Sequence, residues 1–372
     1  MENKQKELLA RIILTQLKGI GPARAKALTT YFGSATAILD LKEHDLKGNP
    51  ALSSSVTQAL LADKKQAIAV AQKEIEFLQN KNIATIYFDD DNYPQHLTDC
   101  IDSPYLVFKK GNGSTIPKKS VAIVGARRAT SYGKDFTDVL VRNLAEHNCT
   151  IVSGLAYGID AAAHKAALKY GTPTLGILGN GLDSIYPASH RNLAIEMMTK
   201  GALLTEYLSG TPSLPANFPK RNRIVAGMVD AVIIVEAAIK GGALVTAKLA
   251  ESYQKDLYAV PGKVGDEFSK GCNHLIKNQK AILLDQPEEL AMELGWERFD
   301  LKKKFKNNLL FEGLNGEEIT VLKQLQIHSS LHLQEIQNNT NINSQQLSGL
   351  LLNLELLNKI KSMPGNQYQL AH

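Results

Sequence analysis

The stretch Val121-Ala122-Ile123-Val124-Gly125-Ala126-Arg127-Arg128-Ala129-Thr130-Ser131 joins a short aliphatic run to a glycine loop and the start of a helical pattern. Similar runs, rich in β-branched or aliphatic residues and bounded by Gly, Asp or Pro, follow at 150–152, 174–178, 231–235 and 256–260. Helical patterns lie between them at 160–169, 191–200 and 244–254. This alternation predicts βαβ units, and therefore an α/β fold with a Rossmann-like, doubly wound, mostly parallel sheet. Ligand sites in such sheets form at the carboxyl ends of the strands.

The composition is that of a globular protein. The chain has 372 residues, 44% hydrophobic and 21% charged, with a formal net charge of +5, which permits nucleic-acid binding without requiring it. The three cysteines are widely spaced and form no CxxC pair, which argues against a metal site. The N-terminus lacks the apolar segment of a signal peptide, and no apolar run is long enough to span a membrane. We therefore expect a cytoplasmic protein.

The sequence pattern divides the chain into four parts. Residues 1–82 have the apolar periodicity of helices, and 83–290 contain the predicted sheet. Residues 291–315 form a charged linker, and 316–372 contain three helical patterns followed by a β segment, which is typical of a winged helix. The third of these helical patterns, within 344–354, carries no cations, which favours protein contact or packing over DNA reading.

The N-terminal part contains a candidate phosphate-binding turn. The segment Leu17-Lys18-Gly19-Ile20-Gly21-Pro22, followed by a helical pattern, fits a helix–hairpin–helix motif in a SAM-like helical domain. Glycines in such a turn let backbone N–H groups approach a phosphate. A tight turn between packed helices would need the same glycines, so both interpretations stay open, and Gly19 and Gly21 are candidate secondary DNA contacts.

The loop after the first strand favours phosphate over a dinucleotide. The dinucleotide fingerprint GxGxxG would need a glycine where Arg127 stands. A cation at this position obstructs close backbone approach to a pyrophosphate but can itself hold a phosphate. We therefore expect no nicotinamide cofactor, and phosphate capture by Arg127 and the helix N-terminus around Thr130 and Ser131.

The other strand-end loops are also rich in glycine. Ser153 and Gly154 open a loop of small residues, Lys240 precedes a glycine pair, and Lys263 follows Pro261-Gly262. Lys240 and Lys263 are therefore further candidate DNA contacts. Asp160 is placed to cap the next helix, and His164 lies one turn further along. This pair could serve acid–base chemistry, but we favour a capping carboxylate and a structural histidine.

The segment Asn217-Phe218-Pro219-Lys220-Arg221-Asn222-Arg223 combines three cations with an aromatic ring. By itself it could be a basic loop leading into a helix. Beside the glycine loops and Arg127 it predicts one wall of a groove that holds phosphates and contacts a flat ring.

The set of motifs resembles the bacterial DNA-processing protein A family (DprA or Smf). The resemblance rests on GxRxxT/SxxG at 125–133, SGxAxGIDxxAH at 153–164, GxGLDxxYP at 179–187, FPxRNRIxA at 218–226 and AVPG at 259–262, and covers about residues 85–285. It implies a protein without enzymatic activity that binds and protects single-stranded DNA, helps load the RecA recombinase during natural transformation, and forms a homodimer through the Rossmann-like domain.

The resemblance also implies the DNA contacts. They fall on Gly125 and Arg127, on Ser153 and Gly154, and on the segment 218–223, where Lys220, Arg221 and Arg223 would take phosphates and Phe218 would pack near a base. One departure is Gly241-Gly242, where the family commonly has serine; the change puts one hydrogen bond to the ligand in doubt.

Two other functions remain open. Lysine-decarboxylase-like phosphoribohydrolases share this architecture and act on nucleotides, but they carry a PGGxGT motif and a catalytic glutamate, whereas this chain has Lys240-Gly241-Gly242-Ala243-Leu244. A structural or protein-interaction role would use the winged-helix-like end as the docking unit.

Overall fold

The computed structural model of the chain describes residues 2–49, 51–296, 314–327, 330–340, 342–357 and 359–370. The chain forms two compact units, 1–299 and 300–372. Most of the expected linker, 291–315, lies outside the described residues, which stop at 296 and resume at 314. Within the described ranges, no helix has the length and apolar character needed to cross a membrane.

The N-terminal part of the first unit is helical, as expected. Its helices in residues 2–80 are α1 (Glu2–Gln16), α2 (Pro22–Phe32), α3 (Ala35–Leu39), α4 (Glu43–Gly48), α5 (Ser54–Ala62) and α6 (Lys64–Asn80). Gly19 has φ +83°, and Gly21 immediately precedes Pro22 at the first turn of α2. Proline is tolerated at that position because its missing N–H would have no partner within the helix. The turn between α1 and α2 therefore needs at least one glycine for its backbone shape.

A nine-stranded sheet forms the centre of the first unit. Its strands are β1 (Ala84–Tyr87), β2 (Leu106–Gly111), β3 (Ser120–Val124), β4 (Thr150–Ser153), β5 (Thr174–Ile177), β6 (Ala202–Thr205), β7 (Ala231–Ile234), β8 (Asp256–Ala259) and β9 (Ile282–Leu283). The strand order is β1-β2-β6-β5-β4-β3-β7-β8-β9. Strands β3 to β9 pair in parallel, whereas β2 pairs antiparallel with β6 and β1 antiparallel with β2. The predicted Rossmann-like, mostly parallel sheet is confirmed.

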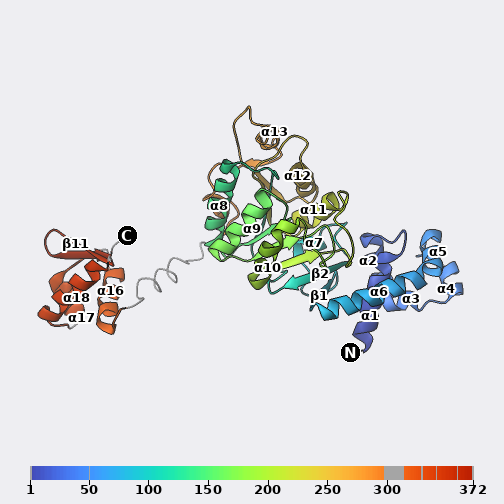
Figure 1. The fold of residues 1–372 in the computed structure, drawn as a ribbon, viewed down its shortest axis with the longest axis horizontal. Helices are drawn as coiled ribbons and strands as arrows, with labels where there is room; N and C mark the ends of the chain where they lie inside the picture. The colour runs from blue at the N-terminus through green and yellow to red at the C-terminus, as the bar shows by residue number, and fades with distance from the viewer. Residues whose placement is uncertain are drawn as a thin grey trace. The chain divides into compact units, whose positions relative to one another are not determined.

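Helices cover both faces of this sheet (Figure 1). They are α7 (Gln95–Thr98), α8 (Ser131–Ala145), α9 (Ile159–Tyr170), α10 (Arg191–Lys200), α11 (Asn217–Gly227), α12 (Gly242–Ser252), α13 (Lys270–Lys277) and α14 (Leu290–Glu293), with a 3-10 turn η1 (Ala188–His190). Alternate residues of β3 enter different cores. Val121 and Ile123 pack with α8 and α9, while Ala122 and Val124 pack with α11 and α12. This alternation follows from the two-residue side-chain period of a strand.

Four strands of this sheet are not predicted from the sequence: β1, β2, β6 and β9. β6 reads Ala-Leu-Leu-Thr and contains one β-branched residue, so its composition gives no strand signal. β2 carries Lys109 and Lys110, and its segment is not among the aliphatic runs that predict strands. The cation-rich segment after residue 216 is also not a loop, because α11 begins at Asn217. Pro219 falls in its first turn, where proline does not break a helix.

The C-terminal unit is a small winged helix. It contains α16 (Gly316–Ile327), β10 (Leu331–His332), α17 (Leu333–Thr340), α18 (Ser344–Leu356), β11 (Ile360–Met363) and β12 (Gln367–Leu370). The strands form a sheet in the order β10-β12-β11, and Leu322, Ile336, Leu347 and Leu351 lie in its core. The three helices and the hairpin that the sequence predicts here are confirmed.

Candidate nucleic-acid interface

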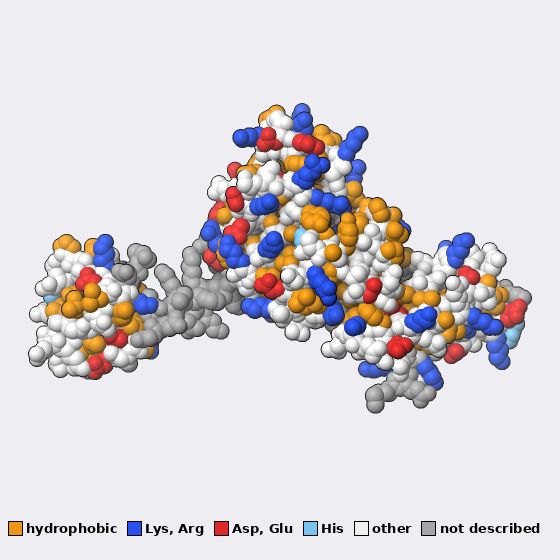
Figure 2. Space-filling view, in the orientation of Figure 1, with side chains coloured by type: hydrophobic (Ala, Val, Ile, Leu, Met, Phe, Trp, Pro, Cys, Tyr) orange, Lys and Arg blue, Asp and Glu red, His pale blue; other side chains and the backbone are white. Residues whose placement is uncertain are grey.

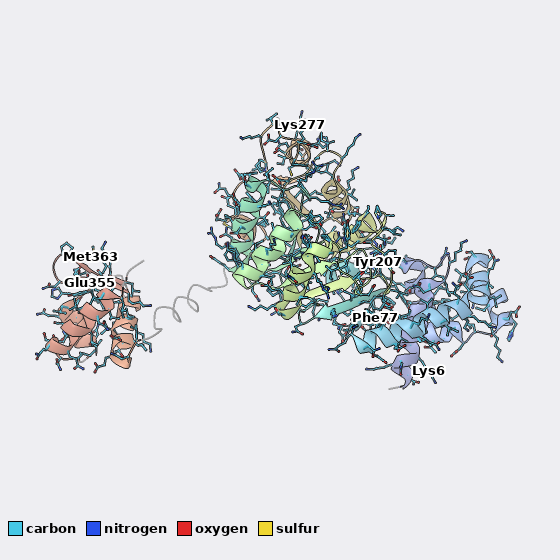
Figure 3. All side chains as sticks on the ribbon, in the orientation of Figure 1. Lys6, Phe77, Tyr207, Lys277, Glu355 and Met363 are labelled. Carbon is cyan, nitrogen blue, oxygen red and sulfur yellow. The ribbon has the colours of Figure 1, made fainter. Side chains whose placement is uncertain are left out.

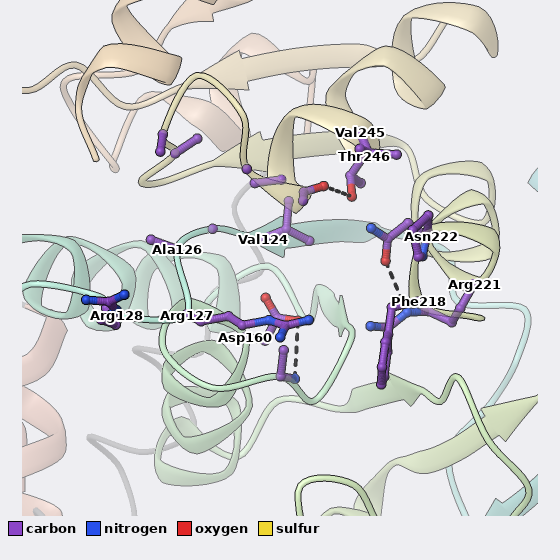
Figure 4. A pocket seen from close by; sticks show the side chains of 18 of the residues that line it. Val124, Ala126, Arg127, Arg128, Asp160, Phe218, Arg221, Asn222, Val245 and Thr246 are labelled. Atoms are coloured by element: carbon purple, nitrogen blue, oxygen red, sulfur yellow. Dashed lines mark hydrogen bonds between the residues drawn. The ribbon is translucent and has the colours of Figure 1, made fainter. Parts of the chain in front are cut away.

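The strand order reverses between β3 and β7, and a cleft lies at the carboxyl ends of these strands. β4, β5 and β6 extend the sheet on one side of β3, whereas β7, β8 and β9 extend it on the other. The loops after β3 and β7 therefore diverge, which leaves an opening of about 540 Å³ between them. The loop 125–128, the start of α11 and the start of α12 line this cleft (Figure 4).

An exposed cation and an aromatic pair meet in this cleft. The Arg127 guanidinium lies 5.7 Å from the centre of the Phe218 ring, and the Tyr186 ring lies 5.4 Å from the Phe218 ring. Figure 4 shows Arg127 directed across the cleft toward Phe218, with Arg128 directed elsewhere. Within the described residues, no carboxylate forms an ion pair with Arg127. The arrangement can hold a phosphate beside a surface that packs against a base.

Two glycines allow the loop that carries Arg127 to sit close to the start of α9. Gly158 has φ +78°, and a Cβ atom there would lie 2.1 Å from the carbonyl oxygen of Ala126. A Cβ atom on Gly125 would lie 2.6 Å from Cγ1 of Ile159. A larger side chain at either position would push the loop away, so both glycines fix the position of Arg127. Gly125 also lines the cleft itself.

The N-terminus of α8 is already occupied by a carboxylate of the chain. Thr130 caps this helix, as its position predicts, and its Oγ1 accepts a hydrogen bond from the Gly133 N–H. However, the Thr130 N–H donates to Glu236 Oε2 over 2.9 Å, and its hydroxyl donates to Glu236 Oε1 over 2.5 Å. Glu236 is only 4% exposed. Because these donors are engaged, we leave Thr130 out of the proposed phosphate contacts.

Arg221 lies under the cleft and is bonded to the backbone. Its side chain is 4% exposed and donates to the carbonyl oxygens of Gly154, which directly follows β4, and of Ile177, the last residue of β5. A Cβ atom on Gly154 would lie 2.5 Å from the guanidinium, so this glycine makes room for it. Burial lowers the pKa of Arg221 to about 10, while the charge of Asp160 opposes the shift. The predicted phosphate ligand Arg221 therefore has a structural role in this fold.

Ser153, Asp160 and His164 are buried and bonded within the protein. Ser153 Oγ donates to the Ile123 carbonyl over 2.6 Å. Asp160 accepts from the N–H groups of Gly154 and Ala156, at 3.1 and 3.4 Å. It therefore orders the preceding loop and does not cap α9, whose N-cap is Gly158, so the expected cap is wrong.

His164 has no role in acid–base chemistry here. Its Nδ1 lies 2.7 Å from Thr174 Oγ1, and burial, with the charge of Arg221, lowers its pKa to about 3. Such a histidine stays neutral at physiological pH. This agrees with the structural role favoured from the sequence.

The cations of α11 do not form one wall, because they point to two sides of a helix. Phe218, Arg221 and Asn222 line the cleft at the switch point, whereas Lys220 and Arg223 line a second cleft toward the N-terminal helices. Residues three or four apart share a helix face, which produces this division. Arg223 also pairs with Glu206. The single continuous wall predicted from the sequence is therefore wrong.

The remaining candidates lie outside the switch-point cleft. Lys240 and Lys263 are exposed on the loops after β7 and β8, and neither lines it. Figure 2 shows Lys and Arg side chains gathered at the end of the unit that carries α12 and α13. Gly21 lines the second cleft, and the Gly19 carbonyl accepts a hydrogen bond from Arg24 Nη1 over 2.7 Å.

The cleft is also lined by Arg128 and Tyr186, which are absent from the sequence-based contacts, and by Asn222, which lies inside the segment 218–223 but has no role assigned to it there. Arg128 follows Arg127 directly, and Tyr186 belongs to a recognised motif, so both lie beside residues that the sequence does identify. Asn222 could have been placed from its spacing of four residues from Phe218, had the start of α11 been known. Within the described ranges, no group of three or more His, Cys, Asp or Glu residues is arranged to hold a metal ion.

The topology and cleft define a class of protein: a doubly wound α/β domain with a cation and aromatic rings at its switch point, followed in the chain by a winged helix. Residues 84–295 match the family model for DNA recombination-mediator protein A, and residues 312–366 match the DprA winged helix domain. The chain belongs to the DNA recombination-mediator protein A family, as the motif resemblance indicated.

Curated relatives agree with this membership. Protein Smf of Escherichia coli K12 is 37% identical over 243 residues, which cover 64% of this chain and 65% of the relative. DNA processing protein DprA of Streptococcus pneumoniae R6 is 39% identical over 202 residues, which cover 54% of this chain and 71% of the relative. The match thus spans slightly less than two thirds of the Escherichia coli protein.

Solved structures show the same fold. DprA from Streptococcus pneumoniae superposes with a TM-score of 0.64 at 29% identity and covers 78% of this chain and 98% of its own. DprA from Helicobacter pylori superposes with a TM-score of 0.52 at 30% identity and covers 58% of this chain and 97% of its own; its structure concerns a single-stranded DNA binding mode.

Proposed function

We propose that this chain binds single-stranded DNA at the switch-point cleft, with one phosphate on Arg127 and one base near Phe218 and Tyr186. The observation that carries the proposal is the exposed Arg127 guanidinium lying beside the Phe218 ring without a carboxylate partner among the described residues. Contacts to a phosphate and to the face of a ring do not depend on base identity, so binding should be tolerant of sequence. The DprA relatives, including the Helicobacter pylori protein studied for its single-stranded DNA binding, support this function.

The proposed role of the bound strand is in DNA uptake and recombination. We infer that the chain protects incoming single strands during natural transformation, helps load the RecA recombinase onto them, and forms a homodimer through the sheet unit. These inferences come from family membership. We also retain the proposed division at 1–82, 83–290, 291–315 and 316–372, in a cytoplasmic protein without cofactor.

No observation favours the alternative nucleotide hydrolase. His164 is fully buried and its side-chain partner is Thr174, while Asp160 is bonded to the loop backbone. We therefore propose binding without a catalytic step. The test is incubation with AMP followed by a search for released adenine. Release of adenine by the wild-type protein that is lost in Asp160→Ala would contradict the proposal.

Fluorescence anisotropy with labelled oligo-dT across a salt series tests DNA binding. Arg127→Ala should weaken binding and reduce the slope of log K against log salt by about 0.7, the value for one phosphate contact on a single strand. Arg142→Ala is the matched control, because Arg142 is an exposed arginine in the last turn of α8, outside the cleft. Equal affinities and slopes for Arg127→Ala and wild type would refute the assignment.

Phe218→Ala tests the aromatic contact in the same assay. Stacking contributes about 1–3 kcal/mol per base, so affinity should fall by about fivefold to 150-fold. Because this change removes no charge, the salt slope should stay that of the wild type. A change in slope with unchanged affinity would contradict the role of Phe218.

RecA loading and dimerisation need separate measurements. Sedimentation of the chain alone should show a dimer, and RecA should assemble faster on single strands when the chain is present. A monomer at all concentrations, or an unchanged RecA assembly rate, would contradict the corresponding inference while leaving DNA binding intact.

A further inference from the structure

A second cleft, of about 560 Å³, lies on the other side of α11, between the N-terminal helices and the sheet. Gln16 and Gly21 line it from the helical side, and Tyr105 and Tyr207 line it from the sheet side. Lys220 and Arg223 of α11 complete the wall. Figure 3 shows Tyr207 at the place where the sheet meets the N-terminal helices.

Hydrogen bonds and ion pairs fix the two walls of this second cleft to each other. The buried Glu74 of α6 accepts from the Ser209 N–H at 3.0 Å and from the Ser209 hydroxyl. Arg11 of α1 forms a two-pronged pair with Asp89, with N–O distances of 2.5 and 2.8 Å. The Thr29 hydroxyl lies 2.7 Å from the Tyr105 hydroxyl. These three pairs join the N-terminal helices to the sheet part of the unit and therefore hold the cleft at a defined width.

The cleft has cationic groups whose charge is only partly compensated. Glu206 pairs with Nη2 of Arg223, and Asp102, which also lines the cleft, accepts from the Tyr253 hydroxyl. Nη1 of Arg223 is buried, and no described residue accepts a hydrogen bond from it. Burial, together with the charge of Arg223, lowers the pKa of the neighbouring Lys26 to about 8. An anion in the cleft would partly neutralise Arg223 and Lys220 and relieve this repulsion between cations.

The two clefts share the first turns of α11. Phe218 faces the switch-point cleft, while Lys220, two residues further on, faces the second one. Pro219 and Lys220 between these faces are exposed. A flexible chain of nucleotides held at Arg127 and Phe218 can therefore pass over this turn into the second cleft.

We propose that the second cleft binds a further nucleotide of the same single strand, with its phosphate on Arg223 and Lys220 and its base against Tyr207 and the Ile20-Gly21 turn. This inference rests on the proposed function of the switch-point cleft. It gives the N-terminal helices a direct part in strand binding, through the cleft wall that they form. It also explains why the cations of α11 are divided between two faces.

A charge introduced on the helical wall tests this path. Gln16 is exposed and lines the second cleft, whereas Gln58 is an exposed glutamine of α5 outside it. Affinities are measured for an oligo-dT of about five nucleotides, which fills the first cleft, and for one of about twenty, which reaches both. Gln16→Glu should weaken binding of the long probe by about threefold, and Gln16→Lys should strengthen it by about threefold, as expected for one charge near a phosphate in water. Gln58→Glu and Gln58→Lys should leave both probes unchanged.

The outcomes separate this inference from the function on which it rests. Opposite effects of the two Gln16 variants on the long probe alone would support the path. Identical affinities for wild type and both Gln16 variants, with normal binding of the short probe, would overturn the path and leave the switch-point site intact. Absence of binding by either probe to wild type would refute the proposed function itself.

Discussion

Arg221 and Arg127 both line the switch-point cleft. We expect substitution of Arg221 to lower the stability of the protein, and substitution of Arg127 to weaken DNA binding. Arg221 is 4% exposed and donates to the carbonyls of Gly154 and Ile177, with Asp160 as the nearby opposite charge. In Arg221→Met these two carbonyls lose their donor and the buried Asp160 carboxylate loses its compensating cation. Removing one partner of a buried charge pair costs about 3–5 kcal/mol, and the lost hydrogen bonds belong to the same network, so we do not add them. We therefore expect Arg221→Met to lower the free energy of unfolding by about 3–5 kcal/mol.

Urea unfolding followed by tryptophan fluorescence measures this change. Trp296 is the single tryptophan of the chain and packs against the core formed by α8, α9 and the sheet. With a denaturant dependence of about 3 kcal/mol per molar urea, the midpoint should fall by about 1–1.7 M. Arg127→Ala should leave the midpoint unchanged, because the Arg127 side chain is exposed and outside the ion pairs of the described residues.

Binding supplies the second half of the comparison. Folded Arg221→Met should bind oligo-dT within about threefold of wild type, because the Arg221 guanidinium is already bonded to backbone carbonyls and its loss removes one charge near the cleft but no direct contact to the strand. Arg127→Ala should lose affinity while keeping its stability. A stable Arg221→Met that loses DNA binding as severely as Arg127→Ala would refute the structural role of Arg221.

Two further predictions concern buried positions. His164 has a pKa lowered to about 3 from an ordinary 6.5, so the unfolded chain binds the additional proton. Its contribution to stability is complete above pH 6.5 and falls by about 1.4 kcal/mol per unit as the pH drops toward 3. Urea titrations across this range should give a shallower slope for His164→Gln, and equal slopes would contradict the buried neutral histidine. Gly158→Ala should cost at least about 2 kcal/mol, because φ is +78° and the new Cβ would meet the Ala126 carbonyl, and DNA binding should fall as the Arg127 loop moves. Wild-type stability and affinity would contradict this.

The sequence predicts the parallel core of the sheet because its central strands are short aliphatic runs with glycine at their ends. Val121–Val124 and Ala231–Val235 are buried on both faces, so their composition carries the signal by itself. β6 has the same burial but only Ala, Leu and Thr, which suit a helix equally well. Its identity as a strand follows from pairing with β5 and β2, which is a tertiary property.

The site was harder to predict at the level of single side chains. The glycine loops and Arg127 could be identified because glycine and cations are unusual together at the ends of buried strands. The burial of Arg221 could not be predicted, because it depends on Gly154 and Asp160, which lie more than 60 residues earlier in the chain. Likewise, Lys220 and Arg221 are neighbours in sequence but face different clefts, since each residue turns by about 100° around a helix.

The position of Glu236 explains how this Rossmann-like domain differs from one that binds a dinucleotide. In dinucleotide sites the helix after the first strand offers its N-terminal N–H groups to a pyrophosphate. Here Glu236 accepts hydrogen bonds from the Thr130 N–H and hydroxyl at the N-terminus of that helix. A Cβ atom on Gly133 would lie 2.5 Å from the carboxyl carbon of Glu236, so the glutamate closely fills the place of the pyrophosphate. A phosphate entering the cleft therefore cannot use the N-terminus of α8, whereas the exposed Arg127 guanidinium at the rim is open to it. Such contacts are exposed and weakened by salt, and they can recur along a chain of phosphates, which suits a nucleic-acid strand better than a single enclosed cofactor.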